Sequence, residues 1–233
     1  MRSLIEYGVD SVALNEVLHR TVSGDSIEAI KLLLDSGADS NAFKAGNFIT
    51  MAAQKALASA CGKGSLPIIR LLLERGADPN IGHVATSIRA ALYRMSDSIE
   101  VLKLLLEHGA DPNLPFIDGS TALLEVLQLV HYCNQRLIHT DSLQAFTLLL
   151  QYGADPNLAK ARTGETPLMV AAKACLTDYV RLLLEHGADV TQVDLTGKSV
   201  LDMMGRTRRY DEMVKLCTQY VDSNKPGAKH VLK

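Results

Sequence analysis

The apolar positions of the chain follow one phrase that recurs five times. Apolar residues at helical spacing lead into three consecutive leucines, and Gly-Ala-Asp follows, with its glycine three residues after the last leucine. The five glycines are Gly37, Gly76, Gly109, Gly153 and Gly187. Because three consecutive leucines cover most of a helix's circumference, the phrase predicts five largely buried helices that each end near a glycine.

The residues around the phrase predict where helices begin and end. Glycine adopts the left-handed conformation that often terminates a helix, and a proline shortly after it prevents continuation, as at Pro79, Pro112 and Pro156. Thr166 followed by Pro167 is typical of a helix start. The 21 residues from Thr166 to Gly187 have room for two short antiparallel helices. One such pair cannot cover its own apolar face, so we expect neighbouring pairs to stack.

The spacing of the glycines predicts two insertions, because successive glycines are 39, 33, 44 and 34 residues apart. In the 39-residue step the excess lies between Phe43 and Gln54, as a lengthened loop or an extended first helix, ahead of a helix that starts near Lys55. In the 44-residue step we expect an overlong first helix over residues 121–137, a turn over 138–141 and a second helix over 142–150. Loops and helix ends are where a stack tolerates insertions.

These motifs resemble the ankyrin-repeat family, and residues 163–172 running to Asp189 carry the strongest likeness. The resemblance covers residues 1–220 and implies an all-α solenoid, in which each 33-residue unit has a β-turn finger and two helices. The family's Thr-Pro-Leu-His motif has Met169 in place of histidine here, whereas His19 matches it in the first full repeat. The family is defined by scaffold residues, so the resemblance implies a binding scaffold without naming a partner.

The same pattern predicts the organisation of the chain. We expect a partial repeat at residues 1–10, about five repeats over 11–198, two of them with insertions, and a degenerate capping repeat over 199–222 with a polar face. Residues 223–233 form a basic tail. The first segment carries only the end of a second helix, so it is either a half-repeat cap or the continuation of a longer array. We favour the second interpretation and expect the chain to be part of a larger multidomain protein.

Composition and charge limit the classes of protein to which the chain can belong. Hydrophobic residues make up 47% of the chain, which excludes disorder, and the formal charge of −2 gives no general reason to bind nucleic acid or an anionic membrane. Only Arg206, Arg208, Arg209 and the tail suggest nucleic-acid binding. We find no membrane span and no signal peptide. The four cysteines are widely separated, which favours a reduced intracellular protein, cytoplasmic or nuclear.

Catalytic and metal-binding signatures are missing from the sequence. His108 and His186 recur with the scaffold at helix ends, and no cluster has zinc-ligand spacing. The sequence Gly197-Lys198-Ser199 lacks the first glycine of a phosphate-binding loop, because Gln192 stands there. We therefore predict no enzyme activity, no cofactor, no metal and no small-molecule substrate.

One short motif suggests an alternative function. Leu129, Cys133 and Leu137 have the spacing with which substrate-recognition subunits of cullin-type ubiquitin ligases bind elongin. The motif lies inside a repeat and has no cullin-selecting segment behind it, and a spacing of four is also that of any apolar helix face. Met213, Cys217 and Val221 imitate the spacing more weakly.

The residues that the scaffold does not need are the candidates for binding. We expect the fingers and first helices to form a concave surface that binds another protein or a peptide. The part of that partner near Lys160 and Arg162 should be acidic. Aromatic and charged side chains are the usual anchors of interfaces. The candidate residues are Phe43, Lys44, His83, Arg89, Tyr93, Phe116, Asp118, Lys160, Arg162 and Lys173.

Overall fold

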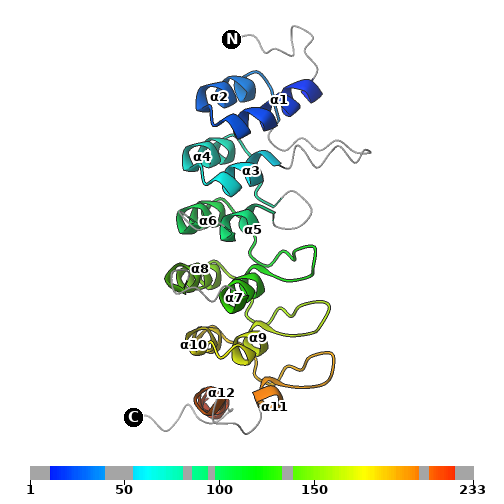
Figure 1. Ribbon diagram of the computed structural model, residues 1–233, viewed down its shortest axis with the longest axis vertical. Helices are drawn as coiled ribbons and strands as arrows, with labels where there is room; N and C mark the ends of the chain where they lie inside the picture. The colour runs from blue at the N-terminus through cyan, green and yellow to red at the C-terminus, as the bar shows by residue number, and fades with distance from the viewer. Residues whose placement is uncertain are drawn as a thin grey trace. The chain divides into compact units, whose positions relative to one another are not determined.

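The computed structural model describes residues 11–39, 55–80, 86–93, 98–132, 139–204 and 210–223. The chain divides into two compact units, Met1–Phe116 and Ile117–Lys233. The described residues of both units form α-helices, and their only β-type pairing is an isolated antiparallel bridge between Val193 and Ser199. The predicted all-α stack of helix pairs is therefore confirmed within each unit (Figure 1).

The described residues of unit 1 form three helix pairs. First helices α1, α3 and α5 pack on one another in one layer, and second helices α2, α4 and α6 pack in another (Figure 1). The bounds are α1 Ser11–Gly24, α2 Ile27–Asp35, α3 Lys55–Lys63, α4 Leu66–Glu74, α5 Thr86–Leu92 and α6 Ser98–Glu107. The described part of α3 begins at Lys55, and residues 51–54 before it are not described. Helix α1 begins at Ser11, more than a turn before the position at which the family motif would start if His19 were its histidine.

Unit 2 repeats this arrangement with three more pairs. First helices α7, α9 and α11 succeed one another, as do second helices α8, α10 and α12 (Figure 1). The bounds are α7 Ala122–Tyr132, α8 His139–Gln151, α9 Pro167–Lys173, α10 Thr177–Glu185, α11 Val200–Met204 and α12 Asp211–Ser223. In the last pair Met213 and Cys217 are buried while the charged residues around them lie outward.

The second helices end as the glycine pattern predicts. The five glycines that follow the leucine triplets all have a positive φ, between 84° and 97°. The residue after each glycine donates its N–H to a carbonyl five residues back, as in Ala77 N to Leu72 O at 2.9 Å and Ala188 N to Leu183 O at 2.9 Å. This pairing satisfies carbonyls that would otherwise be left open at the helix end, which explains why the phrase recurs.

The core of each unit is built from small and aliphatic side chains, as the low aromatic content predicts. Leu72 in unit 1 and Leu183 in unit 2 have no exposed surface. Unit 2 adds one aromatic pair, in which Phe146 of α8 and Tyr179 of α10 meet edge to face with ring centroids 5.0 Å apart. That geometry is favourable for two rings and fixes the second helices against each other.

The predicted course of the second insertion is partly wrong. We expected a turn over residues 138–141, but α8 already begins at His139. Residues 139–141 are helical, so the second helix takes up most of the segment that we expected to form the turn. The described part of the first helix ends at Tyr132, and residues 133–137 of the predicted long helix lie outside the described residues.

Several other predictions concern residues that the structure does not describe. These are the partial repeat at 1–10, the first insertion at 43–54, the arginines at 206, 208 and 209, and the tail from 224 onward. None of the helices in the described ranges combines the length and the apolarity needed to cross a membrane.

Candidate functional site

The fingers of unit 2 are joined side by side through their backbones. Ala161 N donates to Gly119 O at 3.3 Å, and Leu195 N donates to Thr163 O at 3.1 Å. The contact at Gly164 is especially close, because a Cβ added there would lie 2.7 Å from Leu195 N. Gly164 also has a φ of +71°, so both its conformation and its surroundings require glycine. The fingers are therefore held in fixed register rather than projecting independently.

The first helices α7 and α9 pack against each other beside these fingers. Thr166 caps α9, since its Oγ1 accepts a hydrogen bond from Met169 N at 3.3 Å, and Pro167 follows at the first helical position. Along α9, Val170, Lys173 and Ala174 are spaced by three and four residues and so share one face. Gln128 and His131 share a face of α7 in the same way.

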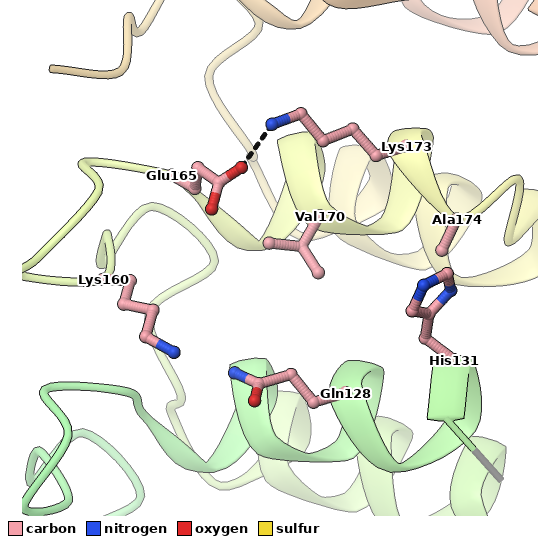
Figure 2. Close-up of a pocket in the computed structure, with 7 residues that line it drawn as sticks. All are labelled: Gln128, His131, Lys160, Glu165, Val170, Lys173 and Ala174. Atoms are coloured by element: carbon pink, nitrogen blue, oxygen red, sulfur yellow. Dashed lines mark hydrogen bonds and ion pairs between the residues drawn. The ribbon is translucent and has the colours of Figure 1, made fainter. Parts of the chain in front are cut away.

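A groove of about 290 Å³ lies between these two faces and the finger that precedes α9. In Figure 2, Gln128 and His131 rise from α7, and Val170 points down toward Gln128 from α9. Lys160 reaches in from the finger, and Glu165 and Lys173 lie together on the α9 side of the groove, across from Gln128 (Figure 2). Ala174 lies beside His131 and completes the lining (Figure 2). The groove therefore combines a small apolar surface with a polar rim that carries two lysines.

Each groove lysine is paired with a carboxylate. Lys160 Nζ lies 3.2 Å from Asp118 Oδ2, and Lys173 Nζ contacts Glu165 Oε1. Burial opposes the ionisation of both carboxyls, but hydrogen bonds and the lysine charges outweigh it and hold the pKa of Asp118 and of Glu165 below the usual value. Because these pairs are partly exposed, each contributes little to stability.

Asp118 also connects the groove to the interior of the repeat. Ser120 Oγ donates to Asp118 Oδ1 at 2.7 Å and lies 3.3 Å from Glu125 Oε2. Glu125 belongs to α7 and is only 2% exposed. Lys160, Asp118, Ser120 and Glu125 thus form a chain of polar contacts from the groove into α7, which fixes the position of the Lys160 amine.

Three of the other candidate residues form a separate cluster in unit 1. The guanidinium carbon of Arg89 lies 5.6 Å from the ring centroid of Tyr93 and 5.2 Å from that of Phe116. Tyr93 is 55% exposed. Phe116 was chosen as a partner-binding candidate, but it is 2% exposed and lies against Arg89, so its ring is not available to a partner. Phe116 therefore supports Arg89 by a cation–π contact instead of meeting a partner.

The remaining candidates fall into two groups. Lys160 and Lys173 line the groove, Asp118 lies behind it as the partner of Lys160, and Arg162 is exposed on the adjoining finger. Phe43, Lys44 and His83 lie outside the described residues.

Sequence reasoning missed five groove residues, namely Gln128, His131, Glu165, Val170 and Ala174. One signal could have found Gln128, which stands seven residues after Thr121, as Lys173 stands seven after Thr166. Equivalent repeat positions present side chains to the same surface, so Lys173 as a candidate also points to Gln128.

We next searched the described residues outside the groove for clusters that could bind a metal ion and for reactive thiols. The described residues contain no group of three or more histidine, cysteine or acidic side chains that could hold a metal ion. Cys61, Cys175 and Cys217 are free thiols. Burial raises the pKa of Cys61 to about 12 and that of Cys217 to about 11, so neither thiol is activated.

The elongin-like motif falls mostly outside the described residues. Leu129 is half-buried on α7, whereas Cys133 and Leu137 are not described. In its weaker copy, Met213 is 2% exposed and Cys217 has no exposed surface, so both side chains serve the core of the last helix pair.

Comparisons with known proteins agree with this architecture. The family model of ankyrin repeats (three copies) matches residues 1–83, 18–116, 87–194 and 130–226. An ankyrin repeat domain from Acinetobacter baumannii is 31% identical with a TM-score of 0.58, covering 73% of this chain and 79% of that domain. The ankyrin repeat domain of Bcl-3, a member of the IκB family, is 26% identical with a TM-score of 0.64, covering 85% of this chain and 81% of that one. No curated protein sequence matches the chain.

Proposed function

Because the chain belongs to the ankyrin-repeat family, whose repeats are generally protein-interaction modules, we propose that it is a non-catalytic scaffold that binds another protein or a peptide in the groove between α7 and α9. The groove itself carries this proposal. Its residues come from two neighbouring repeats and one finger, so it forms only when the repeats stack.

The chemistry of the groove favours a peptide with an acidic residue. Lys160 and Lys173 stand on its rim, and their ion pairs with Asp118 and Glu165 are exposed enough to exchange. An incoming carboxylate can contact either ammonium while an adjacent apolar side chain covers Val170 and Ala174. The volume of about 290 Å³ matches one or two side chains, which is typical of an anchor site rather than a complete interface.

The rest of the proposal concerns organisation and location. Residues 11–198 act as about five repeats and 199–222 as their cap, within a larger multidomain protein. The three free thiols of the described residues are consistent with a reducing, intracellular setting.

A charge reversal in the groove tests the proposal against a matched control. Lys173 and Lys103 are both exposed lysines paired with a glutamate, but Lys103 lies on the second helix α6, away from the first-helix layer. Random 12-residue peptides are selected by display on the full chain, and their affinities are then measured by fluorescence anisotropy. We expect Lys173→Glu to weaken binding by at least tenfold, because it repels an acidic peptide, and Lys103→Glu to change it less than twofold.

Equal effects of the two reversals would place binding outside the groove. If the immobilised chain enriches no peptide beyond what the support without protein retains, the binding function itself is contradicted. Circular dichroism of each variant checks that the helices are retained.

A further inference from the structure

The most exposed large apolar side chains of the described residues are Ile117, at 78%, and Leu195, at 72%. Each stands two residues before the glycine of its finger, Gly119 and Gly197, and both glycines have a positive φ. Arg162 occupies the same position before Gly164 in the finger between them. We call Ile117, Arg162 and Leu195 the finger ridge.

The finger ridge is held rigidly. The backbone bonds from Ala161 to Gly119 and from Leu195 to Thr163 join each finger to the next. Within the last finger, Asp194 Oδ1 accepts hydrogen bonds from Thr196 N at 2.8 Å and from Thr196 Oγ1 at 2.7 Å. A surface that is already ordered loses little conformational entropy when a partner binds, so these exposed side chains are presented in a binding-ready arrangement.

The fold does not require aliphatic side chains at these positions. The glycine turn and its hydrogen bonds use backbone atoms and the neighbouring Asp, Thr and Ser side chains. Leu195 Cγ lies close to Gly164, but Ile117 is 78% and Leu195 72% exposed, so most of each side chain is uncovered within the described residues. These uncovered parts can contribute only when another surface covers them.

The charges on the finger ridge select the kind of partner. Within the described residues, Arg162 makes no hydrogen bond or ion pair. The nearby acids are already engaged, Asp118 with Ser120 and Lys160, Glu165 with Lys173, and Asp194 with Thr196. The charge left available on the ridge is thus a guanidinium, whose planar donors match a carboxylate.

We propose that the finger ridge binds an acidic segment of the partner protein, in which one carboxylate stands between two aliphatic side chains. The carboxylate pairs with Arg162, and the aliphatic side chains cover Ile117 and Leu195. This inference rests on the proposed function and extends it, since Lys160 of the groove and Arg162 of the ridge belong to the same finger and a single segment can contact both.

The test uses peptides selected on the full chain and three sets of variants. The first is the double change Ile117→Ser and Leu195→Ser, with Val17→Ser and Leu32→Ser as its control, because Val17 and Leu32 are also exposed, at 46% and 56%, but lie on α1 and α2. The second is Arg162→Glu, and the third is the groove variant Lys173→Glu. We expect an aliphatic–acidic–aliphatic pattern among the selected peptides and a loss of at least tenfold in affinity for the ridge double variant, with less than twofold for its control.

Charge exchange gives the sharpest readout. A selected peptide is compared with a version in which its acidic residue is replaced by lysine. Wild type should prefer the acidic version, and Arg162→Glu should shift the ratio of the two affinities by at least tenfold toward the lysine version. An unchanged ratio, or selected peptides without the pattern, overturns the ridge proposal.

The variants separate this proposal from the groove. Loss with Lys173→Glu alone leaves the groove function standing and overturns the ridge. Loss with the ridge variants alone supports the ridge and places the binding site away from the groove. If neither set affects binding, or if no peptide is selected, both proposals fail.

Discussion

Two repeats of unit 2 begin their first helices with the same residue but hold it differently. Thr166 caps α9 through its hydroxyl, which accepts from Met169 N at 3.3 Å. Thr121 occupies the same place before α7 and is 3% exposed, yet its Oγ1 has no hydrogen-bond partner within the described ranges. Instead, Ser120 next to it makes the polar contacts, with Asp118 on the finger and Glu125 on the helix.

A repeat can therefore depart from the family pattern and still help to position the groove. The regular repeat secures its helix start locally, through a cap and a proline. The irregular repeat uses a chain of side-chain contacts that ends at Lys160, which belongs to the next finger. The groove is therefore positioned partly by the irregular repeat, because Asp118 holds one of the groove lysines.

Breaking the regular repeat at its finger should have the largest effect. Gly164→Ala introduces a Cβ 2.7 Å from Leu195 N at a φ of +71°, so the two fingers must separate. Gly197→Ala is the matched control, with a φ of +79° and no atom within 4 Å of the added Cβ. We expect a loss of about 3 kcal/mol in the free energy of unfolding for Gly164→Ala and about 1 kcal/mol for Gly197→Ala, measured by urea denaturation.

Similar losses for both glycine variants would mean that the backbone conformation alone decides the cost. The close packing of the two fingers would then play no part.

Removing the hydroxyl from each threonine sharpens the comparison of the two helix starts. Thr166→Val deletes an N-cap acceptor and should cost about 1 kcal/mol of unfolding free energy. Thr121→Val removes a buried hydroxyl that has no partner in the described part of the chain, so it should be neutral or slightly stabilising. Thermal denaturation of the two variants beside wild type measures the difference. Equal destabilisation would show that Thr121 also caps its helix in solution.

The smallest expected effect is on how the stability of the fold changes at acidic pH. The pKa of Asp118 lies below its ordinary value of 3.8 in the folded protein, so the carboxylate stabilises the fold above that value and loses its contribution as the pH falls through the lowered pKa. Lys160→Met removes the paired charge and should raise the pKa of Asp118 toward 3.8, as followed by carbon NMR of the carboxyl. At neutral pH the loss of stability should stay below about 1 kcal/mol, since the pair is partly exposed.

A pKa of Asp118 that does not move in this variant would assign the shift to Ser120 alone. Ser120→Ala should then raise the pKa by itself, because it removes the hydroxyl donor and leaves only the longer bond from Ser120 N to the carboxylate, at 3.4 Å.

The candidate site could be predicted only in part. Lys160 and Lys173 were expected from their place in the repeat, and both line the groove. Gln128 was missed although its place in the repeat matches that of Lys173, whereas finding His131 requires knowing which face of α7 turns toward α9. Phe116 was chosen as a binding candidate but is buried, and its contact with Arg89 joins it to helix α5, 24 residues or more earlier in the chain, which no local pattern indicates.

The sequence by itself determined where the second helices before each glycine end and where α9 begins. A glycine with positive φ after each leucine triplet, and a threonine followed by proline before α9, act through backbone energetics that extend over only a few residues. The tertiary structure decided which side chains line the groove, which acids pair with its lysines, and which apolar residues stay exposed on the finger ridge. Those outcomes depend on what another repeat places against each side chain, and a local pattern carries no information about that neighbour.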